Sequence, residues 1–193
     1  MVIIDIYMKK LFKSAKGFTL VELLIVIAIL GVLAAVVLVA INPAEQLARG
    51  RDASRLQEVA QLGHSVQAYY TAQGALLSTY TSGVAPTAMT NANWQAILVA
   101  TLDISSVVTS PAGGTACTVG AVPSSAQAGF CYTESGTNFL VWGPAESGLY
   151  KGKAKCTAAL PIPFFIYDSS QGKAGVACVA TAGTAPAVGI TLN

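Results

Sequence analysis

The chain has 193 residues, enough for one domain with an appended segment. Hydrophobic residues make up 53% of the chain and charged residues only 10%, which is an apolar balance for a soluble protein. The formal net charge is +2, but the first 17 residues carry four lysines against one acid, so the remainder is close to neutral. Bulk charge therefore predicts neither nucleic-acid binding nor attachment to an anionic membrane surface.

Residues 18 to 41 form an apolar stretch that only Thr19, Glu22 and Gly31 interrupt. A helix of about 20 such residues crosses a bilayer, so the stretch predicts a membrane-spanning helix. Glu22 is unusual there, because a carboxylate inside a span costs roughly 2.5 kcal/mol or more and is a functional candidate. A second interpretation is that Glu22 lies near the membrane edge and reaches the lipid headgroups.

The residues before this span carry a recognisable pattern. A lysine-rich segment ends in Gly17, directly before Phe18-Thr19-Leu20-Val21-Glu22. The pattern resembles a type IV prepilin over about residues 8 to 70, with a basic leader, a glycine at the cleavage point, a phenylalanine start and a glutamate fifth in the processed chain. The resemblance implies that a prepilin peptidase cuts after Gly17, that the new Phe18 amine is methylated and that copies bundle into a helical filament.

The same resemblance implies a role for Glu22 in assembly. After cleavage, Phe18 would carry a charged amine, and Glu22 of one subunit would neutralise the Phe18 amine of a neighbour in the apolar filament core. Removing one partner of such a buried pair strands a charge, at roughly 3 to 5 kcal/mol. We therefore expect Gly17 and Phe18 to serve processing, and Phe18 and Glu22 to serve assembly.

Two other interpretations of the N-terminus remain open. An ordinary secretory signal would be cut after small residues near Ala34-Ala35 or Ala40, although Glu22 and the length of the apolar run argue against it. A plain single-pass anchor is the second. Translation can also begin at Met8, since Met8-Lys9-Lys10 is a more ordinary start than the apolar residues before it.

The cysteines help to orient the chain. All four lie beyond the span, and an even set fits an oxidising, exported compartment, so we expect residues 42 to 193 outside the cytoplasm. Three pairings are possible. We predict the most local one, in which each bridge stabilises by about 3 kcal/mol in the chain-entropy model. The predicted bridges are Cys117 to Cys131 and Cys156 to Cys178.

Beyond the span, Asn42-Pro43 predicts a kink or a break in the helix. Apolar residues then recur three or four apart, which predicts an amphipathic helix that stops at Gln73-Gly74. Glu45 and Arg49 form a favourable i,i+4 pair. The charged residues of this stretch are expected to form a solvated face: Glu45, Arg49, Arg51, Asp52, Arg55 and Glu58.

The rest of the chain is predicted to be a small globular domain. Residues 94 to 100 read as a short helix capped by Asn93, and two hairpins are expected, at 130–142 and 163–179. A helix packed along such an antiparallel sheet is a two-layer α+β fold, which the resemblance also implies. The expected divisions are a leader peptide at 1–17, the apolar transmembrane and filament-core helix at 18–41, its amphipathic continuation at 42–74 and a globular pilin head domain at 75–193.

The sequence does not favour an enzyme. His64 is the only histidine and lies within the amphipathic helix, where a surface or packed position is expected. The cysteines form no C-x-x-C pair, no loop has calcium-site spacing, and Gly113-Gly114 reads as a turn. We therefore predict no catalytic, cofactor-binding or metal-ligating residue.

Lys151, Lys153 and Lys155 alternate and would share one face of a strand. They are interpreted either as a site for DNA or anionic surfaces, or as edge lysines that prevent unwanted strand pairing. The predicted function is a structural subunit of a type IV pilus, anchored in the cytoplasmic membrane before assembly and extracellular afterwards. Its partners would be its own copies, prepilin peptidase and the pilus assembly platform. The alternatives are a pseudopilin of a type II secretion or competence machine, and an anchored surface binding protein that never polymerises.

Overall fold

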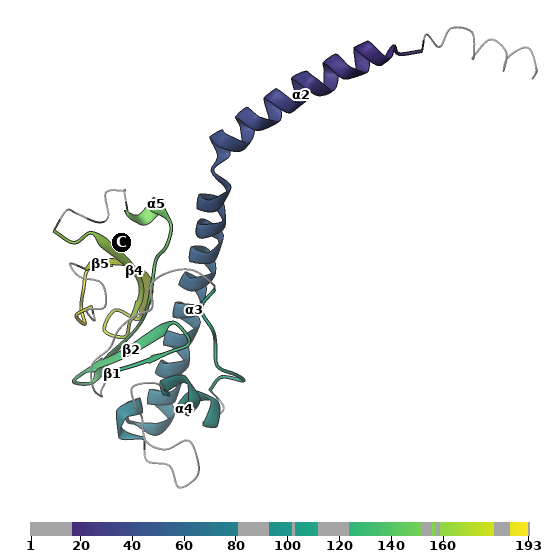
Figure 1. The fold of residues 1–193 in the computed structure, drawn as a ribbon. Helices are drawn as coiled ribbons and strands as arrows, with labels where there is room; N and C mark the ends of the chain where they lie inside the picture. Colours follow the sequence, from purple (N-terminus) through teal and green to yellow (C-terminus); the bar gives the residue numbers. More distant parts are fainter. Residues whose placement is uncertain are drawn as a thin grey trace, which may run out of the picture. The chain divides into compact units, whose positions relative to one another are not determined.

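The computed structural model describes residues 17–80, 93–101, 103–111, 124–151, 156, 159–179 and 186–192 of the chain. The chain divides into two compact units, Met1–Pro43 and Ala44–Asn193, and the second is called the C-terminal unit below. Figure 1 shows the elements in chain order.

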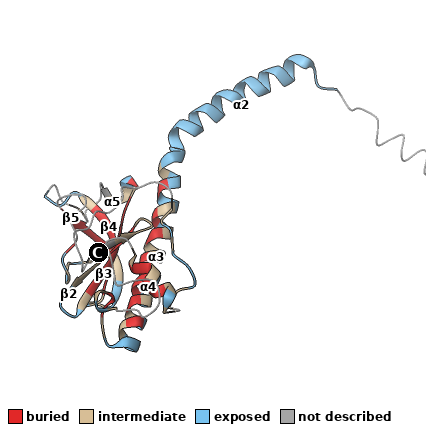
Figure 2. Ribbon diagram, turned by 60° about the horizontal axis from the view of Figure 1, so that its bottom comes forward, coloured by how far each residue is buried: buried red, intermediate tan, exposed pale blue. Residues whose placement is uncertain are grey.

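The first unit consists, where it is described, of one long helix and the residues just before it. Helix α2 spans Leu20–Ile41, and none of its 22 residues is buried. Figure 2 shows it exposed along its whole length. By length and composition it is the only helix of the described residues that is apolar enough to cross a membrane.

The predicted break at Asn42-Pro43 is confirmed. Asn42 adopts the left-handed conformation, with φ 45° and ψ 78°, and Pro43 begins helix α3, which spans Pro43–Gln73. Proline disfavours the helical conformation in the residue before it, whereas the first position of a helix needs no N–H donor. The predicted stop is confirmed as well, because α3 ends at Gln73 and Gly74 has a positive φ of 68°.

The C-terminal unit contains a five-stranded antiparallel sheet with the strand order β1-β2-β3-β4-β5. Both predicted hairpins, β2–β3 and β4–β5, are confirmed, and the fold is α+β. The sequence did not predict β1, whose residues Ser-Ser-Ala-Gln favour no strand. The strands span Ser124–Gln127, Phe130–Ser135, Asn138–Pro144, Ile162–Asp168 and Lys173–Val179.

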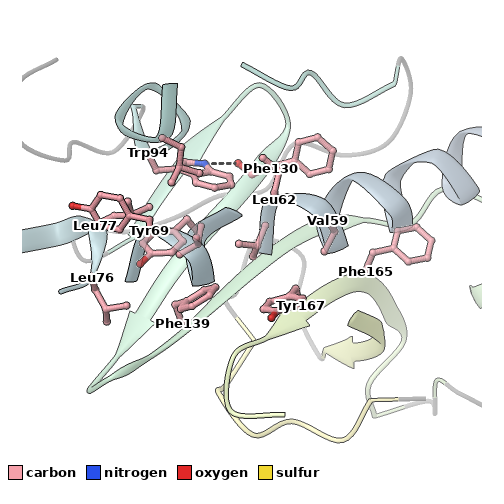
Figure 3. Packing of buried hydrophobic residues seen from close by; sticks show 14 of the residues in the cluster. Val59, Leu62, Tyr69, Leu76, Leu77, Trp94, Phe130, Phe139, Phe165 and Tyr167 are labelled. Carbon is pink, nitrogen blue, oxygen red and sulfur yellow. Dashed lines mark hydrogen bonds between the residues drawn. The ribbon is translucent and has the colours of Figure 1, made fainter. Parts of the chain in front are cut away.

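Helix α3 packs against one face of this sheet, as Figure 3 shows. The core there joins Val59, Leu62 and Tyr69 of the helix to aromatic residues of the strands, such as Phe139 and Tyr167. The helix comes so close that a Cβ added at Gly63 would lie 2.1 Å from Cγ of Tyr167. A glycine is therefore needed at this point of the contact.

The other face of the sheet is buried too. Trp142, Phe164 and Ile166 form a second cluster, and the partly buried side chains of residues 188, 190 and 192 pack against it. The C-terminal segment is held by two hydrogen bonds. The Asp168 carboxylate accepts one from the Gly189 N–H at 2.7 Å, and the Gln171 side chain donates one to the Ile190 carbonyl at 2.7 Å.

The described residues of the unit also form three short helices: η1 (Leu77–Thr79), α4 (Trp94–Ala100) and α5 (Gly148–Lys151). Helix α4 is the predicted one, and Asn93 holds its N-cap position as predicted, but the Asn93 side chain forms no capping hydrogen bond. Asn93 has φ −133° and ψ 14°, outside the extended region typical of a capping residue. Instead, Oε1 of Gln127 accepts from the backbone N–H groups of Gln95 at 2.8 Å and Ala96 at 3.3 Å.

Candidate functional site

The N-terminal turn of α2 forms a closed set of hydrogen bonds. Thr19 is the capping residue, and its hydroxyl oxygen accepts from the Glu22 N–H at 3.2 Å. The Glu22 carboxylate in turn accepts from the Thr19 N–H and the Thr19 hydroxyl, both at 2.8 Å. This capping box satisfies donors that a helix start otherwise leaves open, and it places a negative charge at the positive end of the helix dipole.

The residues expected to serve processing and assembly lie together around this turn. Phe18 directly precedes Thr19 and is 85% exposed, and no atom lies within 4 Å of the position that a Gly17 Cβ would take. Both residues are exposed. Sequence reasoning had not assigned a role to Thr19, although Thr-x-x-Glu before an apolar run is the pattern of a capping box.

The rest of α2 offers no polar group. Its large apolar side chains are between 48% and 85% exposed, and they lie on every side of the helix. A helix that is apolar all round belongs in lipid or in the middle of a helix bundle. Glu22 is thus the one carboxylate of a segment that requires apolar surroundings.

A second polar cluster lies near the start of α3, and it corrects an expectation. Asp52 and Arg55, predicted on a solvated face, are 1% and 0% exposed. Asp52 accepts from Arg55 at 3.0 Å and from the backbone N–H groups of Glu146 at 2.9 Å and Ser147 at 2.8 Å. The loop after β3 therefore covers this part of the helix, and helical periodicity alone does not reveal such a cover.

Arg55 is fully satisfied within this cluster. It donates to the Ser110 hydroxyl and the Pro111 carbonyl, each at 3.0 Å, and to Glu146 at 3.3 Å. Arg51 also binds Glu146, through its Nε at 2.9 Å. The hydrogen bond and charge of Arg51 lower the pKa of the Glu146 carboxyl despite its partial burial. These hydrogen bonds and ion pairs hold the loop after β3 against α3, so the cluster has a structural role.

The predicted pair of Glu45 and Arg49 is confirmed, at 3.3 Å. Glu45 also accepts from the Gly148 N–H at 3.1 Å, and this hydrogen bond is the main cause of a lowered pKa of Glu45. Glu45 and Asp52 therefore hold consecutive backbone N–H groups at the start of α5.

His64 is exposed on α3, and its ring meets that of Tyr167 edge to face, with the ring centres 5.1 Å apart. This is the surface position expected for it. Within the described part of the chain, no group of three or more His, Cys, Asp or Glu side chains is placed to hold a metal ion.

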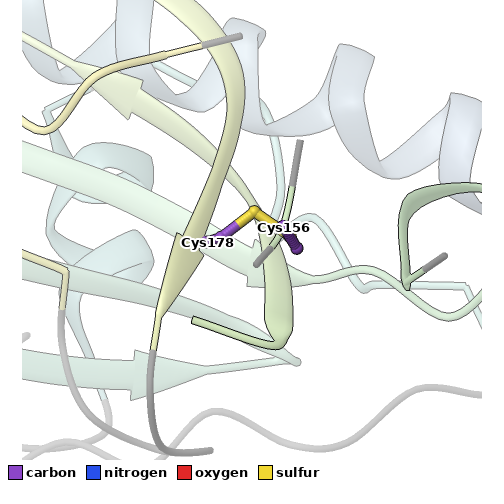
Figure 4. Close-up of a disulfide and its surroundings, with 2 residues drawn as sticks. All are labelled: Cys156 and Cys178. Carbon is purple, nitrogen blue, oxygen red and sulfur yellow. A yellow bond between two sulfur atoms is a disulfide. The ribbon is translucent and has the colours of Figure 1, made fainter. Parts of the chain in front are cut away.

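A disulfide joins Cys156 to Cys178 of β5, with their Cα atoms 5.4 Å apart, as Figure 4 shows. Cys131 is disulfide-bonded as well, but its expected partner, Cys117, lies outside the described residues. Lys151, the first of the alternating lysines, is the last residue of helix α5. Lys153 and Lys155 lie outside the described residues.

Comparison with family models matched residues 12–38 to the prokaryotic N-terminal methylation motif. Neither the search of curated proteins nor the search of solved structures gave a match. The matched residues include Gly17, Phe18, the capping box and most of α2. The chain therefore carries the signature of type IV pilins and prepilin-like proteins at its N-terminus, which indicates a membrane-anchored structural protein.

Proposed function

We propose that this chain is the structural subunit of a type IV pilus filament. The precursor is held in the cytoplasmic membrane by residues 18–41, with the C-terminal unit exported. Prepilin peptidase cuts after Gly17, the Phe18 amine is methylated, and the pilus assembly platform adds the subunit to an extracellular filament. The observation that carries this proposal is a wholly exposed apolar helix whose only carboxylate lies in its first turn, within the methylation motif.

The exposed surface of α2 supports polymerisation. Outside lipid, so much apolar area needs another apolar surface, and the same helix of other copies supplies one. The C-terminal unit has its own core, formed between α3 and the sheet, and its fold does not require α2. An anchor helix can then leave the membrane for a filament without unfolding the rest of the chain.

The chemistry of the first turn supports the assembly role of Glu22. In the precursor, the nitrogen of Phe18 is part of a peptide bond, and the Glu22 carboxylate is held by the two donors of Thr19. Cleavage creates an ammonium group at Phe18. In an apolar filament core each charge would be costly alone, so Glu22 of one copy pairs with the Phe18 amine of the next and sets the axial register.

Fractionation tests this function. The chain is expressed in a host with a pilus machine and without its own major pilin, and the cells are sheared. Extracellular filaments seen by electron microscopy, whose subunit begins at Phe18 by mass spectrometry, would support the proposal. Short filaments retained in the periplasm would instead support a pseudopilin. Retention of all the protein in the membrane would indicate a plain anchor.

A further inference from the structure

The last residues of the C-terminal unit that the structure describes lie on the second face of the sheet. Val188, Ile190 and Leu192 are partly buried and pack against the apolar cluster that contains Trp142. The residues that alternate with them are exposed. One side of this segment therefore faces the sheet, and the other side faces solvent. We call residues 187–192 the C-terminal strap.

The C-terminal strap contains a tight turn. The Ile190 N–H donates to the Ala187 carbonyl at 3.2 Å, and Gly189 has a φ of 80°. A positive φ at the third residue of a turn suits glycine, because an L side chain there is strained. A Cβ added at Gly189 would meet nothing within 4 Å. Alanine at this position would therefore be disfavoured by its backbone conformation and not by a clash.

Few hydrogen bonds hold the C-terminal strap in place. Among the described residues, two join it to the rest of the unit, each at 2.7 Å. Asp168 accepts one from the Gly189 N–H, and the Gln171 side chain donates the other to the Ile190 carbonyl. In contrast, β5 pairs with β4 along its whole length. Lifting the strap from the sheet therefore breaks far fewer hydrogen bonds than separating these two strands.

Opening of the strap would uncover part of a closed apolar cluster. Trp142, Phe164 and Ile166 of this cluster are at most 2% exposed. Segments with few buried contacts and few hydrogen bonds open at a lower free energy than core strands do. The other core of the unit is not involved, because it lies between α3 and the opposite face of the sheet. The strap is thus placed to move without the rest of the fold.

We propose that the C-terminal strap is a lid, which opens and closes on the second face of the sheet while the rest of the C-terminal unit stays folded. Asp168 and Gln171 hold the closed position. The closed lid covers the apolar cluster, whereas the open lid leaves an apolar patch around Trp142 in contact with solvent. The lid therefore controls access to this face. This role goes beyond the proposed function and does not depend on it.

Hydrogen exchange, measured by mass spectrometry on the full chain in detergent, tests the lid. In the unmutated chain the amides of the strap should exchange at least about tenfold faster than the paired amides of β4 and β5. The reason is that the strap amides exchange by opening of the lid, whereas the strand amides require unfolding of the sheet. This comparison needs no substitution, so it does not depend on how any variant folds.

Strain in the turn of the strap gives a second measurement. Gly189→Ala should speed exchange of the strap about tenfold, because alanine disfavours the left-handed conformation of the closed turn. Gly136→Ala is the matched control, since Gly136 has a φ of 61° in the β2–β3 turn and a Cβ there also meets nothing within 4 Å. It adds the same strain away from the strap, so exchange of the strap should be unchanged.

A further pair of variants tests the residues that hold the lid closed. Gln171→Ala removes the donor to the Ile190 carbonyl and should speed exchange of the strap about fivefold. Ser169→Ala is its control in the same turn, because the Ser169 hydroxyl oxygen accepts from the Phe139 N–H at 2.7 Å and not from the strap.

Strap amides that exchange as slowly as those of β4 and β5 would overturn the lid. An unchanged exchange rate in Gly189→Ala, or equal acceleration by Gly136→Ala, would overturn it as well. No difference between Gln171→Ala and Ser169→Ala would contradict the role of Gln171 in holding the closed position.

Discussion

Helix α2 and the C-terminal unit differ in which side chains they expose and which they bury. In α2 the apolar side chains are exposed, and the single carboxylate is satisfied within one turn, by Thr19. In the C-terminal unit both sheet faces are covered, and even charged side chains such as Asp52 and Arg55 are buried with partners. The apolar side chains of α2 therefore need lipid or other apolar helices around them. Those of the C-terminal unit are buried in its own core.

The comparison predicts that changes in the first region affect processing and assembly without affecting folding of the second. The largest effect is expected at Gly17. Gly17→Leu places a bulky side chain at the proposed cut and should abolish cleavage, which mass spectrometry of the membrane fraction would show as an uncleaved chain. Gly31→Leu adds the same side chain within α2, where a Cβ meets nothing within 4 Å, and should leave cleavage intact.

Glu22→Gln should strongly reduce filament yield, because it leaves the Phe18 amine unpaired in the filament core at roughly 3 to 5 kcal/mol. Cleavage and membrane insertion should be unchanged. Thr19→Val is the control, since it removes a hydroxyl donor to Glu22 but keeps the charge, and should cost far less. If the Glu22→Gln chain gave as many filaments as the unmutated chain, the assembly role of this carboxylate would be contradicted and only its role in the capping box would remain.

Changes in the C-terminal unit should act on stability. Asp52→Ala removes one of the two carboxylates that pair with the buried Arg55, and the acceptor of two loop N–H groups, so it should lower the free energy of unfolding by about 3 to 5 kcal/mol. Thermal unfolding in detergent, followed by tryptophan fluorescence, measures this. Arg49→Ala breaks an exposed pair and should cost less than about 1 kcal/mol. Equal losses of unfolding free energy for Asp52→Ala and Arg49→Ala would contradict a stabilising role of the buried cluster.

Gly63→Ala should destabilise by about 1 to 3 kcal/mol, because its Cβ would overlap the buried ring of Tyr167. Gly50→Ala is the matched control on the same helix. A Cβ there meets nothing within 4 Å, so alanine should stabilise by about 0.5 to 1 kcal/mol through its better helix propensity. The same unfolding measurement should therefore give opposite signs for the two glycines.

The smallest expected effect is a pH dependence of the loop before α5. The pKa values of Glu45 and Glu146 are lowered from an ordinary value of 4.5, the first by the Gly148 N–H and the second by Arg51. The folded state then binds fewer protons than the unfolded chain, so this stabilisation is present above about pH 4.5 and is lost as the pH falls further. Melting temperatures between pH 7 and pH 3.5 should show the loss, and a Glu45→Gln chain should show a shallower one. Identical pH profiles of the two chains would contradict it.

Local sequence sufficed where local chemistry decides the structure. The apolar run of α2, the break at Asn42-Pro43 and the stop at Gly74 were all predicted from neighbouring residues, because helix limits depend on contacts within a turn or two. The two hairpins were predicted for the same reason, since each pairs strands that a short turn joins. The Thr-x-x-Glu pattern at residues 19–22 also indicates the capping box, although the sequence analysis assigned no role to Thr19.

Only the tertiary structure decided the features that depend on distant partners. Strand β1 forms because β2 offers it an edge, and α4 is capped by Gln127, more than 30 residues further along the chain. Arg55 is buried because Ser110, Pro111 and Glu146 surround it from loops far away in sequence. A periodic pattern shows which side chains share a helix face, but whether a loop covers that face depends on how the whole chain packs.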